Sequence, residues 1–249
     1  MPGKPNIKWK EGDLKNAFQK HQNSEGSNFD QPFNKMVKSG VDASKNLIDC
    51  NPGRMSRKHL EAIFHFIDTS YKAGLSRYIS RSAEWRKIQP VNISTLNWLI
   101  FHKLTDSEIN FISSSLVCKK WRTSFNTDEF DPSLIIRSAA IIASHTEGIQ
   151  RSSGGPISFC SKLSFFFNGM TPIFDKYASS AASQIAGQRK KIPHSYAKHC
   201  DRVFEIMGVI CNTSTFTPKQ LKDVDGFLME YGIKREQQNQ QAKKQTNSK

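Results

Sequence analysis

The chain has 249 residues and carries 36 Lys and Arg against 22 Asp and Glu, a formal net charge of +14 at pH 7. Hydrophobic residues make up 37% and aromatic residues 10% of the chain, and this aromatic content excludes a wholly disordered protein. No apolar run reaches the roughly 18 residues of a membrane span, and the first residues lack the apolar core of a secretory signal, so we expect a cytoplasmic protein with no membrane partner.

The cysteines, histidines and glycines favour no bound metal or cofactor. The five cysteines, at positions 50, 118, 160, 200 and 211, are widely spaced and form no Cys-x-x-Cys pair. This pattern favours reduced thiols over a disulfide framework or a zinc site. No histidine pair has metal-ligand spacing, and no phosphate-binding Gly-rich loop occurs. We therefore expect neither a metal nor a cofactor.

The excess of positive charge instead points to a polyanionic partner. Lys and Arg side chains release counterions when they neutralise a phosphate backbone, so nucleic acid is the commonest partner of so basic a protein. Two alternatives stay open: a merely soluble basic surface, and an adaptor that binds an acidic protein.

Helical patterns begin near the N-terminus. Residues 1–30 are predicted to form a flexible basic arm with a short helix over 12–20, and residues 31–130 an N-terminal helical region. Within that region Ser56 suits a helix N-cap. The residues that follow it, Leu60, Ile63, Phe64 and Ile67, recur at the three- and four-residue spacing of an amphipathic helix. Gly74 is the predicted stop of this helix.

Residues 75–89 form the most basic part of this region. Tyr78 and Trp85 lie between the cations Arg77, Arg81, Arg86 and Lys87. Such a segment can place cations on phosphates and stack aromatic rings on bases, although an ordinary solvated helix face has the same composition. Similar basic clusters occur further along the chain, at Lys119, Lys120 and Arg122 and at Arg189, Lys190 and Lys191.

The next elements are also predicted to be helical. Thr105 and Glu108 match the capping-box pattern and predict a helix that runs to about Trp121. Residues 124–132 are predicted to be a polar loop. Pro132 then suits the first turn of a helix over 133–146.

Residues 154–175 combine a tight Gly154-Gly155-Pro156 element, a predicted helix start at Ser161-Lys162 and the segment Pro172-Ile173-Phe174-Asp175. This pattern resembles the helix-hairpin-helix DNA glycosylase superfamily, and in particular bacterial 8-oxoguanine-glycosylase-like proteins, over residues 130–232. The resemblance implies a hairpin that grips DNA through Gly154, Gly155 and Ser161. It also implies a catalytic lysine at Lys162 and a catalytic aspartate at Asp175.

Two features depart from the family's pattern: the second hairpin glycine is missing, and the spacing from Lys162 to Asp175 is short. Both residues also have structural interpretations. Asp175 lies where a helix N-cap is expected, and Lys162 can extend its ammonium group from a helix start to the solvent.

Three more helices are predicted in the remaining sequence, over 176–187, over 195–210 and from Thr217-Pro218 to Gly232, where glycine suits a helix end. Residues 233–249 have almost nothing to bury and are predicted to be a disordered basic tail. No alternating strand pattern occurs, so the fold class is all-α.

The sequence thus predicts a basic protein that binds double-stranded DNA through phosphate contacts. The alternatives are a DNA glycosylase or lyase that uses Lys162 and Asp175, and a non-enzymatic adaptor for an acidic protein.

Overall fold

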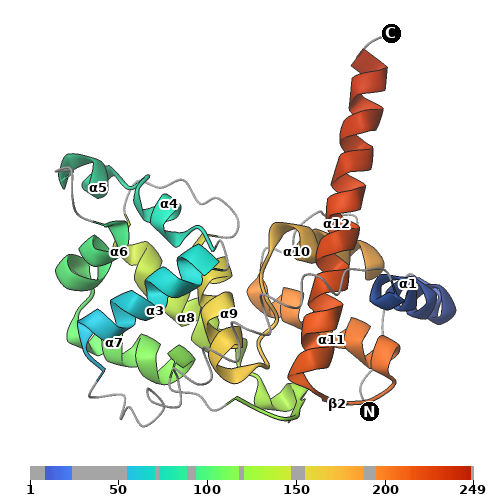
Figure 1. Ribbon diagram of the computed structural model, residues 1–249, viewed down its shortest axis with the longest axis horizontal. Helices are drawn as coiled ribbons and strands as arrows, with labels where there is room; N and C mark the ends of the chain where they lie inside the picture. Colours follow the sequence, from blue (N-terminus) through green and yellow to red (C-terminus); the bar gives the residue numbers. More distant parts are fainter. Residues whose placement is uncertain are drawn as a thin grey trace. The chain divides into compact units, whose positions relative to one another are not determined.

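The computed structural model describes residues 9–23, 55–70, 73–88, 94–117, 121–146, 155–187 and 195–247. The described residues are mostly helical (Figure 1), as predicted, with only a two-stranded ribbon besides the helices. The chain divides into two compact units. Unit 1 comprises residues 1–30, 124–129 and 174–249, and unit 2 comprises residues 31–123 and 130–173. The units cut across the expected regions, since the predicted region 131–232 contributes to both.

Unit 2 begins with one long helix, continues with a series of short helical segments and ends with two more long helices. The elements are α3 (Arg57–Ser70), α4 (Leu75–Ile79), α5 (Ala83–Ile88), α6 (Thr95–Asn97), the π-helical segment η3 (Trp98–Lys103), α7 (Asp106–Ile112), the π-helical segment η4 (Ser113–Val117), α8 (Pro132–Ser144) and α9 (Gly155–Asn168).

Helix α9 is buried in the core of unit 2. Every residue from Phe159 to Pro172 is buried except Lys162, which is half-buried. Phe159 contacts Phe64 of α3 edge to face, with ring centroids 4.7 Å apart. Burial also raises the pKa of the Cys160 thiol. The apolar run around Lys162 is therefore core sequence, and the predicted α3 stripe packs against it.

Several local predictions in unit 2 are confirmed. The Ser56 hydroxyl accepts a hydrogen bond from the backbone N–H of His59. Gly74 is not the stop that was predicted: α3 ends at Ser70, and Gly74 adopts the left-handed conformation at φ 77° as the N-cap of α4. Thr105 and Glu108 form a reciprocal capping box at the start of α7, and Pro132 lies in the first turn of α8.

The helix expected after Thr105 starts where predicted, but α7 is followed by the π-helical segment η4, just as α6 is followed by η3. At the end of η3 the Arg57 guanidinium donates hydrogen bonds to the carbonyls of Ile100 and Leu104. A side chain thus satisfies carbonyl groups that a regular helix would pair with backbone N–H groups.

Unit 1 is a small helical bundle. It consists of α1 (Glu11–Asn23), the strands β1 (Phe125–Asn126) and β2 (Thr215–Phe216), the 3₁₀ turn η5 (Thr127–Glu129), α10 (Lys176–Ile185), α11 (Tyr196–Cys211) and α12 (Pro218–Asn247). The strands pair antiparallel, with Phe125 opposite Phe216. Residues 124–132 therefore do not form the loop that was predicted for them, because this short ribbon buries both phenylalanines.

The N-terminal region is not a flexible arm throughout. Helix α1 includes the predicted helix 12–20, and its Leu14 and Phe18 are buried. Phe18 packs edge to face on Phe227 of α12. This apolar contact explains why the helix is held in unit 1.

The prediction that the last helix ends at Gly232 is wrong. Helix α12 runs to Asn247, and Gly232 lies within it, where a Cβ atom would come 2.3 Å from the carbonyl oxygen of Tyr177 on α10. The glycine permits close packing of α10 and α12 rather than ending a helix. Residues 237–247 accordingly continue the helix instead of forming the predicted disordered tail.

Candidate nucleic-acid interface

The basic segment of residues 75–88 forms two short helices with a defined start. The carboxylate of Asp68, at the end of α3, accepts hydrogen bonds from the backbone N–H groups of Leu75 and Ser76 and from the Ser76 hydroxyl. These bonds satisfy N–H groups that the first turn of α4 leaves unpaired. No sequence pattern points to this role of Asp68, since it lies seven residues before the helix that it caps and follows no capping spacing.

Four cations of this segment face the solvent. Arg77, Arg81, Arg86 and Lys87 are exposed, and none of them forms an ion pair within the part of the chain that the structure describes. The Arg86 guanidinium donates to the carbonyl of Arg81 at 2.8 Å, so these two residues lie close together. We call Arg77, Arg81, Arg86 and Lys87 the α4–α5 cations.

The one acidic residue of the segment does not neutralise these cations. Glu84 pairs with Lys103 of η3, and the two charged atoms are 2.9 Å apart. The Lys103 ammonium also lies 5.6 Å from the centre of the Trp98 ring. This half-buried pair links α5 to η3 and leaves the α4–α5 cations without a compensating acid among the described residues.

The two aromatic residues of the segment take part in the packing of unit 2, which bears on the base-stacking alternative left open by the sequence. Trp85 is 5% exposed and packs edge to face on Trp98 at 6.0 Å. Tyr78 is half-buried, and a Cβ atom at Gly155 would come within 2.6 Å of its ring. Both rings are used for packing, so they are not available to stack on bases.

The Tyr78–Gly155 contact brings together two features that were predicted separately. Gly155 is the first residue of α9, and it must lack a side chain because the Tyr78 ring occupies that space. The N-terminus of α9 therefore lies against Tyr78 of α4, the residue that follows Arg77 in the sequence. Of the residues predicted to form the hairpin, Gly154 lies outside the described residues, whereas Gly155 and Ser161 lie within α9.

The predicted start of a helix at Ser161-Lys162 is wrong, because α9 already begins at Gly155. Ser161 is fully buried, and its hydroxyl donates to the carbonyl of Ser158 at 3.0 Å, so it does not face a DNA backbone. Lys162 lies within α9 and is half-buried.

Asp175 belongs to unit 1, whereas Lys162 belongs to unit 2. Asp175 is the N-cap of α10, and its carboxylate accepts a hydrogen bond from the backbone N–H of Tyr177 at 2.8 Å. The capping interpretation of Asp175 is therefore confirmed as a structural role.

Of the other predicted DNA contacts, Arg122 is exposed, and its backbone N–H donates to the carbonyl of Asn168 at 3.2 Å. Lys119, Lys120, Arg189, Lys190 and Lys191 lie outside the described residues.

No protein-family model, no curated protein and no solved structure matches the chain. Among the described residues, no helix combines the length and apolar composition needed to cross a membrane. Within the same part of the chain, no three His, Cys, Asp or Glu side chains gather as a metal site would require.

Proposed function

We propose that the protein binds double-stranded DNA through its phosphate backbone and that the α4–α5 cations make part of the contact. The observation that carries this proposal is a group of four exposed cations without acidic partners among the described residues, on a segment that packs against the N-terminus of α9. Phosphates are favoured near the N-terminal end of a helix, where the backbone dipole is positive. The net charge of +14 supports the same partner.

The helix-hairpin-helix resemblance supports the same surface. Consecutive helices α8 and α9 pack together, and the segment between them leads into Gly155. In the proposed interface the first turn of α9 would contact the DNA backbone, with the α4–α5 cations beside it. A cytoplasmic location and a bacterial origin fit this proposal and are predictions of the sequence.

The test compares charge removal at this surface with equal charge removal elsewhere. We expect Arg81→Gln with Arg86→Gln to weaken binding of a fluorescent duplex and to reduce the slope of log affinity against log salt by about 0.9 for each phosphate that is no longer neutralised. The matched control is Lys20→Gln with Lys219→Gln, two exposed lysines of unit 1.

If the two double variants weaken duplex binding equally, the α4–α5 cations contribute only general positive charge, and the proposed interface is overturned. Absence of duplex binding at low salt would overturn DNA binding as a whole. In that case, saturable one-to-one binding of an acidic protein would favour the adaptor alternative.

A further inference from the structure

The C-terminal part of α12 continues beyond every element of unit 1 that packs against it. The last side-chain contacts to α10 are a hydrogen bond from Arg235 to Gln184 at 3.2 Å and an ion pair between Lys176 and Glu236 at 2.9 Å. Residues 237–242 and 244–246 are exposed, and Figure 1 shows this end of α12 extending past α10 and α11. We call residues 237–247 the α12 projection.

The projection has an unusual composition for an exposed helix. Five consecutive residues carry amide side chains: Gln237, Gln238, Asn239, Gln240 and Gln241. All five are exposed. No Asp or Glu follows Glu236, and Ala242 is the one apolar residue of the projection. No side chain described in the projection is buried, and the projection lacks the apolar seam that pairs a helix with a second copy.

The side chains instead suit the edges of DNA bases. A Gln or Asn amide has one donor and one acceptor side by side, which match N6 and N7 of adenine in the major groove. An α-helix fits into that groove, and the projection, about 16 Å long at 1.5 Å per residue, is long enough to cross its width of about 12 Å. The lack of acidic residues avoids repulsion by the phosphates on both sides.

The positive charge of the projection is weaker evidence for a DNA partner than its amide side chains are. Cations near a helix C-terminus interact favourably with its dipole in any helical protein, so Lys244 in the last turn has an ordinary structural explanation. Glutamine suits an exposed helix, but the five amide side chains form no hydrogen bond to another part of unit 1 that the structure describes, so they are available to a partner.

We propose that the α12 projection enters the major groove of duplex DNA and contacts adenine edges through its amide side chains. This inference rests on the proposed DNA binding and adds base recognition at a second place in the chain. The helix itself is required, since an extended tail would not fix the amides at the spacing of neighbouring base pairs. The packed part of α12 supplies the nucleus from which this helix propagates.

The first experiment tests recognition of the base edge. The double variant Gln237→Ala with Gln241→Ala removes two amides that lie one helical turn apart. It leaves the charge unchanged and does not lower the helix propensity. Binding is measured to an adenine-rich duplex and to the same duplex with 7-deazaadenine, which lacks the N7 acceptor. We expect the wild-type chain to prefer the natural duplex roughly tenfold and the double variant to lose that preference.

The control is Gln19→Ala with Gln22→Ala, two exposed amides on α1, which should keep the preference. The second experiment uses Ala242→Pro, which interrupts the helix without a change of charge. It should weaken duplex binding and leave the salt slope nearly unchanged.

Equal binding of the natural and 7-deazaadenine duplexes by the wild-type chain would overturn the inference, as would an unaffected Ala242→Pro variant. A change in oligomeric state in either variant would assign the projection to a second copy and would also overturn it. Since the α4–α5 double variant is measured in parallel, these failures are distinguishable from a failure of the proposed DNA binding.

Discussion

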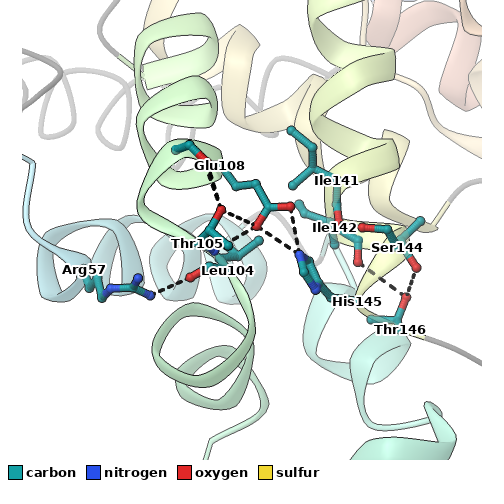
Figure 2. Close-up of polar contacts among 11 residues, drawn as sticks. Arg57, Leu104, Thr105, Glu108, Ile141, Ile142, Ser144, His145 and Thr146 are labelled. Atoms are coloured by element: carbon teal, nitrogen blue, oxygen red, sulfur yellow. Dashed lines mark hydrogen bonds and ion pairs between the residues drawn. The ribbon is translucent and has the colours of Figure 1, made fainter.

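His145, at the C-terminus of α8, lies with its Nε2 atom 3.0 Å from both carboxylate oxygens of Glu108, in the first turn of α7 (Figure 2). The same carboxylate accepts hydrogen bonds from the Thr105 backbone N–H at 2.8 Å and from the Thr105 hydroxyl at 2.9 Å. A capping box that would otherwise serve α7 alone therefore also holds the end of α8. On the other side, Arg57 donates to the carbonyl of Leu104 and pairs with Asp106.

The stability of unit 2 should depend on pH through Glu108. Partial burial favours the neutral carboxyl, but the hydrogen bonds from Thr105 and His145 outweigh it and hold the pKa of Glu108 below its ordinary value of 4.5. Because folding lowers this pKa, the unfolded chain binds more protons at acid pH. The stabilisation is complete above pH 4.5 and is lost as the pH falls through the folded-state pKa.

We therefore expect Glu108→Ala to reduce the free energy of unfolding by about 0.5–2 kcal/mol at neutral pH, and we expect the difference from wild type to shrink toward pH 3. Urea unfolding at several pH values measures both. Glu11→Ala, at an exposed i,i+4 pair, is the control and should cost less. A loss for Glu108→Ala that stays constant with pH would contradict the role of the ionised carboxylate.

Gly232 should tolerate no larger residue. A Cβ atom at this position would come 2.3 Å from the Tyr177 carbonyl oxygen, which is backbone and cannot rotate away, so Gly232→Ala should cost about 1–3 kcal/mol of unfolding free energy, as overpacking does. Gly208 of α11 is the matched control, because no atom lies within 4 Å of its Cβ position. Gly208→Ala should stabilise the helix by about 0.5–1 kcal/mol. A neutral Gly232→Ala would show that α10 and α12 pack less closely than described.

Two substitutions of Asp175 distinguish its role as a helix cap from any other role of this residue. Its carboxylate accepts the Tyr177 N–H, so Asp175→Ala should cost about 0.5–2 kcal/mol, whereas Asp175→Asn should retain most of the stability because an amide oxygen also caps. Thermal unfolding of the two variants measures the difference. Equal losses would indicate that the negative charge, rather than the acceptor oxygen, stabilises α10.

The glycosylase alternative predicts a covalent intermediate. A lysine that attacks the anomeric carbon would form an adduct with a modified-base duplex, which borohydride traps. Lys162→Ala should then abolish trapping, and Asp175→Asn should abolish base release while leaving duplex affinity unchanged. If no adduct forms with any base tested, the two residues have structural roles alone, with Asp175 as a cap and Lys162 as the half-buried position of a core helix.

The sequence predicts the local features of this fold better than its packing. The stripe from Leu60 to Ile67 and the capping box at Thr105 depend on neighbours within one helix, so periodicity and spacing were sufficient to find them. The prediction of a helix end at Gly232 was wrong because glycine suits both a helix end and a close helix crossing. Only its contact with Tyr177 distinguishes the two.

The candidate interface was predicted in part for the same reason. The exposed cations follow from the charge run itself. The burial of Trp85 and Tyr78 does not, since it depends on Trp98 and Gly155, which lie far from them in the sequence. The extension of α12 likewise has no apolar pattern that could predict it, because its helix propagates from a part of α12 that is already packed.

The buried Trp85–Trp98 pair makes tryptophan fluorescence sensitive to changes beside the α4–α5 cations. Trp85 is flanked in sequence by exposed Arg86, and its indole is shielded from water by packing on Trp98. Tryptophan emission is sensitive to solvent, so undocking of α5 from η3 would shift it to longer wavelength, whereas a ligand that binds the rigid surface would leave it nearly unchanged. In a variant in which the other two tryptophans, Trp9 and Trp121, are replaced by Phe, fluorescence can thus distinguish binding to a preformed surface from binding that rearranges α5.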